Sequence, residues 1–479
     1  MPAADFRAAA GPALADPQLR ANFRRAMDGL MSKRAAVFAD RDEWTALRSL
    51  GATIRARSLL QLPDLLERLE AKLTENGVKV HWAETIEQGN AIFKQILSGH
   101  DARRLVKGKS MVSEEMGLNH ALEAEGIEVV EADLGEYIIQ LDHEKPSHII
   151  MPAIHKNKQQ IARLFSQKIK DAAYTEDVDH LTGLARRVLR QKFAEADAGV
   201  SGVNVAVAET GTLVLVENEG NGRMCTTIPK LHIAVMGLEK VVERLEEVPP
   251  VLSLLTRSAT AQPITTYVNM ISGPRRPGEK DGPQELHLVI LDNGRSRVFA
   301  DPQLRNTLRC IRCGACMNHC PVYTRVGGHA YPGVYPGPIG KILTPQILGM
   351  ETAGDLPHAS SLCNACVEVC PVEIPIASLL VRLRSEAIRP RRQADSGPGV
   401  VRGAGSQRDA AETWTWRGWA LAYRVPLLYR LTSFLLSRFG WALPQRLPLL
   451  KEWTTVRSRP QFAPQTLHEL ARREKVSNE

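Results

Sequence analysis

A chain of 479 residues is too long for one hydrophobic core, so we expect roughly two to four domains. Its hydrophobic content of 44% and charged content of 24% are those of a folded globular protein and exclude global disorder. The formal charge of +8 makes the chain basic, but lysine and arginine are interspersed with acids, and no aromatic–basic stretch indicates a nucleic-acid face. We therefore expect a mixed, solvated surface and no nucleic-acid partner.

The first part of the chain is predicted to be helical. Apolar residues recur at helical spacing over residues 16–40 and 59–76, which indicates two amphipathic helices. Charged residues occur from Asp5 onward and no long apolar stretch follows them, so we expect no secretory signal. Residues 1–57 are interpreted as an N-terminal helical segment.

From residue 78 onward, short apolar runs alternate with helical stretches, which predicts an α/β fold. The runs expected to form strands are residues 78–82, 105–106, 127–130, 148–151, 202–208, 212–216, 231–235, 264–270 and 286–291. The stretches expected to form helices are residues 85–97, 113–125, 156–168 and 179–194. We place this α/β domain at residues 58–297.

Two turns rich in glycine, threonine and asparagine, residues 209–212 and 218–223, flank one expected strand. Such turns need no function, because asparagine–glycine pairs are common in tight turns. Open α/β sheets, however, bind ligands near strand ends, and six polar residues lie near expected strand ends: Lys107, Lys109, Glu209, Asn218, Glu219 and Arg223. They are candidates for a site that binds an oxygen-rich, anionic ligand, with Glu209 as a candidate base or nucleophile.

Seven of the eight cysteines belong to one motif that occurs twice, fifty residues apart. The two copies are Cys310-x2-Cys313-x2-Cys316-x3-Cys320-Pro321 and Ser360-x2-Cys363-x2-Cys366-x3-Cys370-Pro371. Three cysteines at this spacing converge on one iron–sulfur cluster, while the cysteine before the proline ligates the other cluster. We therefore expect cluster one on Cys310, Cys313, Cys316 and Cys370, and cluster two on Cys320, Cys363 and Cys366.

Ser360 stands where the first cysteine of the motif should recur. Cluster two could therefore be a [3Fe-4S] centre, a [4Fe-4S] cluster whose last iron is held by Ser360 or water, or a [4Fe-4S] cluster completed by another subunit. A pair of zinc sites is the rival interpretation, since CxxC pairs also bind zinc, but zinc needs neither the third cysteine nor the proline. Cys225 has no partner in the motif and is expected to be a small buried residue or an inert thiol.

The double motif lies in a predicted helical, ferredoxin-like domain of residues 298–390. Helix-compatible stretches cover residues 303–310 and 376–387, and the proline- and glycine-rich residues 327–338 predict a loop between the motifs. The cysteines are concentrated in this domain, as metal ligands are in proteins of a reducing compartment. We therefore expect a cytoplasmic location.

The C-terminal part is predicted to be a linker, residues 391–406, followed by a helical tail, residues 407–479. The tail has five of the seven tryptophans: Trp414, Trp416, Trp419, Trp441 and Trp453. Arginines and a proline interrupt its apolar stretches, so none approaches the ~20 residues that span a bilayer. Such a tail can dock on a partner subunit, fold back on its own domains, or contact the inner face of a membrane peripherally.

The chain resembles the lactate utilization protein B family. The resemblance lies in residues 107–115, 209–212, 218–223 and 228–232, followed by the double cysteine motif with its serine at Ser360 and the tryptophan-rich tail. It implies a Rossmann-like lactate-utilization domain related in fold to sugar isomerases and CoA-transferases. It also implies the iron–sulfur subunit of a bacterial three-protein system that oxidises L-lactate to pyruvate, with electrons passing toward a quinone or another carrier.

Other functions stay open from the residues alone. The α/β domain can be a catalytic or regulatory carboxylate-binding module with the clusters as its redox outlet, or the chain can be the iron–sulfur subunit of another 2-hydroxy-acid dehydrogenase. No G-x-G-x-x-G follows an expected strand, so no fingerprint supports flavin or NAD chemistry in this chain. We therefore expect the chemistry on lactate to occur in a partner subunit or at an interface, and this chain to transfer electrons.

Overall fold

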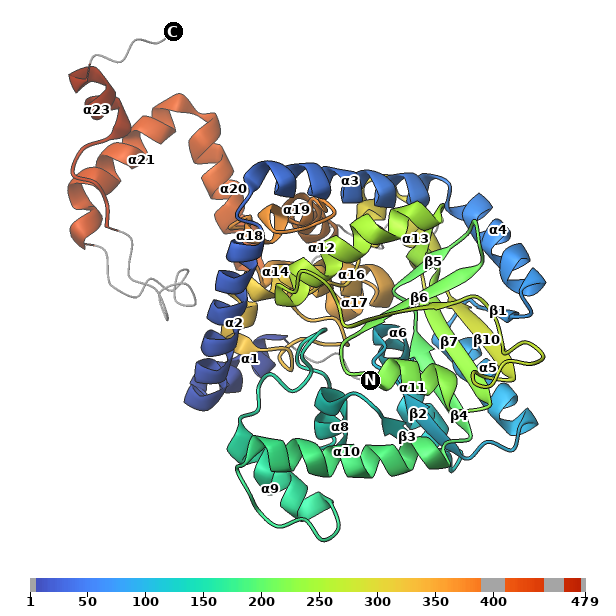
Figure 1. Ribbon diagram of the computed structural model, residues 1–479. Helices are drawn as coiled ribbons and strands as arrows, with labels where there is room; N and C mark the ends of the chain where they lie inside the picture. The colour runs from blue at the N-terminus through green and yellow to red at the C-terminus, as the bar shows by residue number, and fades with distance from the viewer. Residues whose placement is uncertain (1–5, 389–409, 443–460, 475–479) are drawn as a thin grey trace. The chain divides into compact units, whose positions relative to one another are not determined.

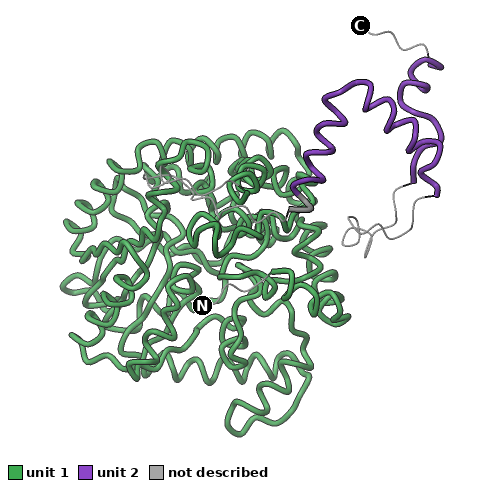
Figure 2. The backbone as a smooth tube through the Cα atoms, turned by 180° about the vertical axis from the view of Figure 1, so that it is seen from behind, with its two compact units in different colours: residues 1–405 green, residues 406–479 purple. Residues whose placement is uncertain are grey.

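The structure, a computed structural model, describes residues 6–388, 410–442 and 461–474 (Figure 1). The chain forms two compact units, residues 1–405 and residues 406–479 (Figure 2). The predicted linker, residues 391–406, and Trp453 lie outside the described residues.

A six-stranded sheet forms the centre of the first unit, and all of its strands are parallel. In pairing order the strands are β1 (Lys79–Ala83), β10 (Glu285–Leu291), β7 (Leu231–Gly237), β4 (Ala198–Gly202), β2 (Arg104–Lys107) and β3 (Glu128–Glu131). Valine, isoleucine and leucine are frequent in these strands, as is typical of a parallel sheet with both faces covered. The structure confirms the predicted α/β fold.

Side chains along the strands alternate between the two faces of this sheet. In β7, Ile233 and Val235 belong to one buried cluster, whereas Ala234 and Met236 belong to another. The helices packed in the first cluster are α5 (Ile86–Gly99), α6 (Met111–Met116) and α7 (Leu118–Glu123). Near the β2–β3 edge, the opposite face is covered by α8 (Leu134–Leu141), α9 (Lys158–Lys168) and α10 (Val178–Glu195) (Figure 1).

A smaller four-stranded sheet lies beside the main one. Its strands, in pairing order, are β8 (Val241–Val242), β5 (Val205–Val207), β6 (Thr212–Glu217) and β9 (Tyr267–Ile271). The predicted strand of residues 202–208 is divided between the two sheets, because β4 ends at Gly202 and β5 begins at Val205. The helices between these strands are α11 (Asn221–Thr227), η1 (Leu238–Lys240), η2 (Leu245–Glu247) and α12 (Val248–Thr260).

Four helices precede the first strand: α1 (Phe6–Ala15), α2 (Pro17–Val37), α3 (Arg41–Leu60) and α4 (Leu62–Glu75). The carboxylates of Asp16 and Asp40 accept main-chain N–H groups in the first turns of α2 and α3, which fixes where these helices begin. Farther along, the predicted helix of residues 113–125 is divided into α6 and α7 at Gly117, whose φ is +61°.

The predicted strand of residues 148–151 is wrong, because this segment forms bends rather than a strand. His148 is fully buried, and its Nδ1 accepts the main-chain N–H groups of Ile150 at 3.0 Å and Met151 at 3.2 Å. Its Nε2 pairs with the Asn318 amide oxygen at 2.9 Å. The His148 side chain therefore accepts the main-chain N–H groups that the carbonyls of a neighbouring strand would accept in a sheet.

The cysteine motifs lie in a helical region, and no strand occurs in the described residues between residue 295 and residue 388. Its elements are α13 (Arg295–Ala300), η3 (Leu304–Arg309), α14 (Ala315–Asn318), α15 (Tyr323–Val326), α16 (Gly337–Leu348), α17 (Met350–Ala353), η4 (Leu356–His358), α18 (Ala365–Glu368) and α19 (Ile376–Ile388). The backbone repeats as the cysteines do, because Gly314 and Asn364 both have positive φ and precede α14 and α18. The predicted loop of residues 327–338 is shorter in the structure and covers residues 327–336, because α16 begins at Gly337.

The described part of the second unit is helical. It consists of α20 (Ala410–Arg424), α21 (Pro426–Phe439), η5 (Gly440–Ala442) and α23 (Leu467–Arg473). The described tryptophans of this unit have exposed fractions between 53% and 79%, so they are not packed into a core of their own unit: Trp414, Trp416, Trp419 and Trp441. Within the described ranges, no helix combines the length and the apolar content that crossing a membrane requires.

Candidate functional site: two cysteine cavities beside an α/β cavity

The four cysteines predicted to ligate cluster one line one small cavity: Cys310, Cys313, Cys316 and Cys370. Cys370 comes from the second copy of the motif, so the fold brings it back to the three cysteines of the first copy. The rest of the lining is mostly apolar and includes Ile311, Ile339 and Ile374. We call this space the cluster-one cavity.

A second cavity, the cluster-two cavity, is lined by the remaining residues of the double motif: Cys320, Cys363, Cys366 and Ser360. Cys320 is buried, whereas Cys363 is exposed. Lys341 is fully buried, and its Nζ lies 3.4 Å from the Cys320 sulfur. This cavity is therefore open to solvent on one side and has a buried cation on the other.

The chemistry of these cavities fits bound iron. The pKa of Cys313 is raised to about 12 and that of Cys370 to about 11, mainly by burial and in part by the neighbouring Cys310 thiolate. Buried thiolates that repel one another are stable only around a cation. Main-chain N–H groups also donate to the sulfurs, from Ile374 to Cys370 at 3.3 Å and from Arg312 to Cys310 at 3.4 Å. Such hydrogen bonds are among the features that set cluster potentials.

Arginines of the N-terminal helices hold the cysteine loops in place. Arg48 of α3 donates from Nε to the Cys370 carbonyl and from Nη2 to the Val367 carbonyl, both at 2.8 Å. Arg34 of α2 donates to the Val369 carbonyl at 3.2 Å. These three carbonyls belong to the second motif copy, so α2 and α3 fix the loop that delivers Cys370 to the cluster-one cavity.

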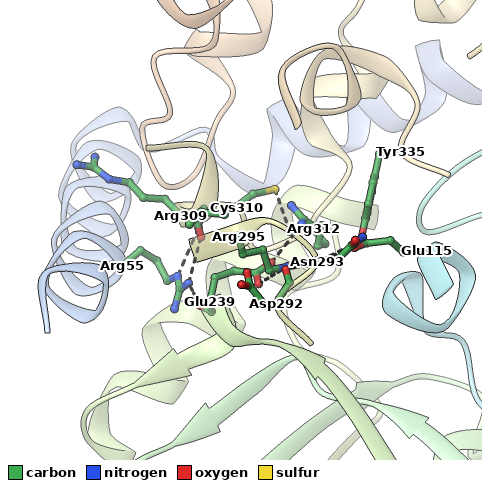
Figure 3. A network of polar contacts seen from close by, with 11 residues as sticks. Arg55, Glu115, Glu239, Asp292, Asn293, Arg295, Arg309, Cys310, Arg312 and Tyr335 are labelled. Atoms are coloured by element: carbon green, nitrogen blue, oxygen red, sulfur yellow. Dashed lines mark hydrogen bonds and ion pairs between the residues drawn. The ribbon is translucent and has the colours of Figure 1, made fainter. Parts of the chain in front are cut away.

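A buried ionic network joins the first motif copy to the α/β domain (Figure 3). Arg295 makes a two-pronged contact with Glu115, with both N–O distances 2.8 Å, and its Nε donates to Glu239 at 2.8 Å. Glu239 also pairs with Arg312 at 3.2 Å, and Tyr335 donates to Glu115 at 2.6 Å. The loop that contains Cys310 is thereby tied to the end of the sheet.

Glu239 is the centre of this network. Burial alone would raise the pKa of Glu239, but Arg295 and Arg312 hold it at about 2. The close approach depends on Gly237 at the end of β7, because a Cβ atom there would lie 2.2 Å from the Glu239 carboxylate and 2.5 Å from Arg295 Nε. The charged groups therefore occupy space that any other residue at position 237 would fill.

A larger cavity of about 320 Å³ lies in the α/β domain beside the cluster-one cavity. Three predicted site residues line it: Lys109, Asn218 and Glu219. Arg312 and Ile149 line both this cavity and the cluster-one cavity, so one layer of side chains separates the two spaces. We call the larger space the α/β cavity.

The other three predicted site residues do not line the α/β cavity. Lys107 is fully buried, where its Nζ contacts Glu131 at 2.7 Å and Glu114 at 3.0 Å. Glu209 lies in the turn before β6 and accepts the Leu245 amide at 3.0 Å. Arg223 lies on α11 with an exposed side chain. The six residues therefore do not form one site.

Several charged residues of this region were not predicted from the sequence: Arg55, Glu115, Glu239, Lys240, Arg295 and Arg312. Arg312 lies inside the cysteine motif and Glu115 is the last residue of the segment 107–115, so the sequence positions of these two residues were a weak indication that they belong to the site. Lys240 lines the α/β cavity, where burial, and then Arg312, lower its pKa to about 8. Cys225, expected to be buried, is fully buried under the sheet.

Comparison with known families follows the same division of the chain. Residues 66–291 match the LUD domain family, and residues 306–374 match the 4Fe-4S dicluster domain family. Residues 382–476 match the family described as lactate utilisation protein B, C-terminal. The chain is therefore an iron–sulfur protein that joins an LUD domain to a 4Fe-4S dicluster domain.

Named relatives show to which protein family the whole chain belongs. Lactate utilization protein B of Shouchella clausii is 41% identical over 463 residues, which cover 95% of this chain and 94% of the relative. The protein of the same name from Bacillus subtilis is 45% identical over 77% of both chains. An Escherichia coli K12 relative, named uncharacterized electron transport protein YkgF, is 45% identical over 79% of this chain and 80% of its own. The chain belongs to the lactate utilization protein B family.

Proposed function

We propose that this chain is the iron–sulfur electron-transfer subunit of a system that oxidises L-lactate to pyruvate. The observation that supports the proposal most directly is the gathering of seven motif cysteines around two adjacent cavities within a 4Fe-4S dicluster domain. The substrate comes from the names of the relatives, which are lactate utilization proteins.

The proposed ligands follow the two cavities. Cluster one would be held by Cys310, Cys313, Cys316 and Cys370, and cluster two by Cys320, Cys363 and Cys366. The last position of cluster two would be filled by Ser360, by water or by a residue of another subunit, or would be vacant in a [3Fe-4S] centre. When bound, clusters of this kind supply one-electron chemistry at potentials from roughly −700 to +450 mV, set by ligands and surroundings.

The protein's own residues would set these surroundings. Apolar side chains form most of the lining of the cluster-one cavity, while the Lys341 ammonium beside Cys320 favours added negative charge at cluster two. We propose that lactate is oxidised in a partner subunit or at an interface, and that this chain delivers the electrons to a quinone or another carrier at the membrane or in the cytoplasm.

A second candidate function is favoured by one observation, the α/β cavity beside the cluster-one cavity. In this alternative the LUD domain binds a carboxylate, either as a catalytic site or as a regulatory one, and the clusters are its redox outlet. Glu209 is not part of this cavity, so a catalytic base would have to be another residue.

The test is anaerobic EPR with iron and sulfide analysis, before and after L-lactate is added with and without the partner proteins. The relay predicts spectra that lactate reduces only when the partners are present. Reduction by lactate with this chain alone would instead favour the second candidate. Zinc without sulfide would refute both.

A further inference from the structure

The α/β cavity contains a lysine that has no partner among the described residues. Lys240 is 6% exposed, lines the cavity, and forms no hydrogen bond or ion pair there. A buried ammonium that forms no hydrogen bond or ion pair is unfavourable, and the nearby Glu239 carboxylate, which favours its charge, is already paired with Arg295 and Arg312. Lys240 is therefore placed to receive an anion.

Arg312 supplies a second unused donor at the same end of the cavity. Its Nη2 pairs with Glu239 at 3.2 Å and its guanidinium lies 4.8 Å from the centre of the Tyr335 ring, while its Nη1 is buried and has no hydrogen-bond partner among the described residues. Arg312 also exerts the strongest electrostatic influence on Lys240 of any neighbouring charged group. Two cations that line the cavity thus lie close enough to influence one another, and each has an N–H donor without a hydrogen-bond partner.

The acidic residues of the cavity do not neutralise this end. Asp133 lies 3.7 Å from the Lys109 ammonium, and Glu217 and Glu219 each accept main-chain N–H groups. The charged groups that act most on Glu219 are Asp133, Lys109 and Glu217, not Lys240. The cavity therefore has an acidic end whose groups already have partners and a cationic end whose donors are free.

We propose that the α/β cavity binds an organic carboxylate, whose carboxylate group is held between Lys240 and Arg312. A guanidinium and an ammonium together form charge-assisted hydrogen bonds to a carboxylate from two directions. The volume of about 320 Å³ corresponds to roughly ten water molecules at ~30 Å³ each. A three-carbon acid fills only part of it, so the cavity also accommodates larger acids whose bodies reach toward Asn204 and Asn218.

This inference deepens the second candidate function and rests on it, not on the electron relay. It names the residues that hold the ligand, and it places the ligand one side-chain layer from the cluster-one cavity, with Arg312 and Ile149 between them. Binding is measurable without any electron transfer, so its failure and the failure of the relay are separate results.

The test is isothermal titration calorimetry of the oxidised, cluster-loaded chain without partner proteins. The probes are L-lactate, pyruvate and oxalate, with inorganic phosphate as the comparison anion. We expect carboxylate binding that Lys240→Met weakens at least about tenfold, the loss expected for one charge-assisted hydrogen bond. Lys94→Met is the matched control, because Lys94 lies on α5, pairs with Glu125 and does not line the cavity.

Two further measurements separate a binding role from a structural one. Removing a buried, unpaired charge should leave the Tm of Lys240→Met unchanged or raise it, whereas a structural role predicts a fall in Tm. Lys240→Arg keeps the charge and should keep measurable carboxylate binding. Absence of carboxylate binding in the wild type, equal affinity in wild type and Lys240→Met, or binding of phosphate alone would each overturn the proposal.

Discussion

Replacing Lys341 with methionine should lower the reduction potential of cluster two. The Lys341 ammonium is fully buried and 3.4 Å from the Cys320 sulfur, so it stabilises the more negative, reduced state. Methionine retains most of the side-chain volume and removes the charge, which makes reduction less favourable. The direction of the shift follows from this one contact.

The magnitude can be worked from the same distance. At 3.4 Å and an effective dielectric constant of about 20, two unit charges interact by about 5 kcal/mol, equivalent to about 200 mV for one electron. The added electron is shared over a whole cluster rather than held at this sulfur, so that value is an upper bound. We expect a fall of about 50 to 200 mV.

The assay is a redox titration followed by EPR, in which Cys363→Ser identifies the signal of cluster two. Cys320 stands in the first motif copy but lines the cavity of the second, so the shift should affect the signal that Cys363→Ser alters. Lys94→Met, an exposed charge removal on α5, should leave both potentials unchanged. If Lys341→Met shifted the cluster-one signal instead, or neither signal, the crossed assignment of Cys320 would be refuted.

Three further changes test other parts of the structure. Ser360→Cys adds a thiol to the cluster-two cavity, so a three-iron centre should gain iron and shift in potential, and an unchanged EPR spectrum would count against Ser360 as a neighbour of that cluster. Arg48→Met removes two hydrogen bonds to main-chain carbonyls, so it should destabilise the chain by about 2–4 kcal/mol in thermal unfolding and speed the loss of iron to a chelator. The control is Arg41→Met, at the exposed start of α3. Equal effects of the two substitutions would refute the role of Arg48. Burial, and then His287, lower the pKa of His232 to about 3, so the unfolded chain binds the proton first and stability falls as pH drops from about 6.5 toward 3. His232→Gln should reduce the loss of unfolding free energy between pH 7 and pH 5 by about 2 kcal/mol in urea titrations, and an unchanged loss would contradict the neutral buried imidazole.

The parts of the structure that were predictable from sequence are those set by local spacing. The equal cysteine intervals predicted two loops of the same kind, and the fifty-residue repeat appears in the backbone as the positive φ of both Gly314 and Asn364. Short apolar runs likewise predicted most of the parallel strands. Residues 148–151 have the same apolar character, but the His148 side chain takes up their N–H groups, and no periodicity reveals that.

The charged part of the site was not predictable, because long-range packing assembles it. Glu239 follows β7, Arg295 begins α13, and Arg312 lies within the cysteine motif, so nothing in their local sequence indicates that they meet. Strand-end position alone selected Lys109 correctly as a cavity residue but also selected Lys107, whose side chain turns under the sheet toward Glu131. The position of a residue near a strand end shows where its backbone lies, but not whether its side chain points into the cavity.

The two cysteine cavities differ in what adjoins them, and the repeated backbone explains how. Arg312 and Leu362 hold equivalent positions in the two copies, and both have positive φ, which costs a non-glycine residue roughly 1 kcal/mol. In the first copy the side chain reaches Glu239 and the α/β cavity, whereas in the second copy Leu362 is 37% exposed beside the exposed Cys363. One loop therefore faces the LUD domain and the other faces solvent. In the proposed electron relay, cluster one would therefore lie beside the LUD domain and cluster two beside solvent.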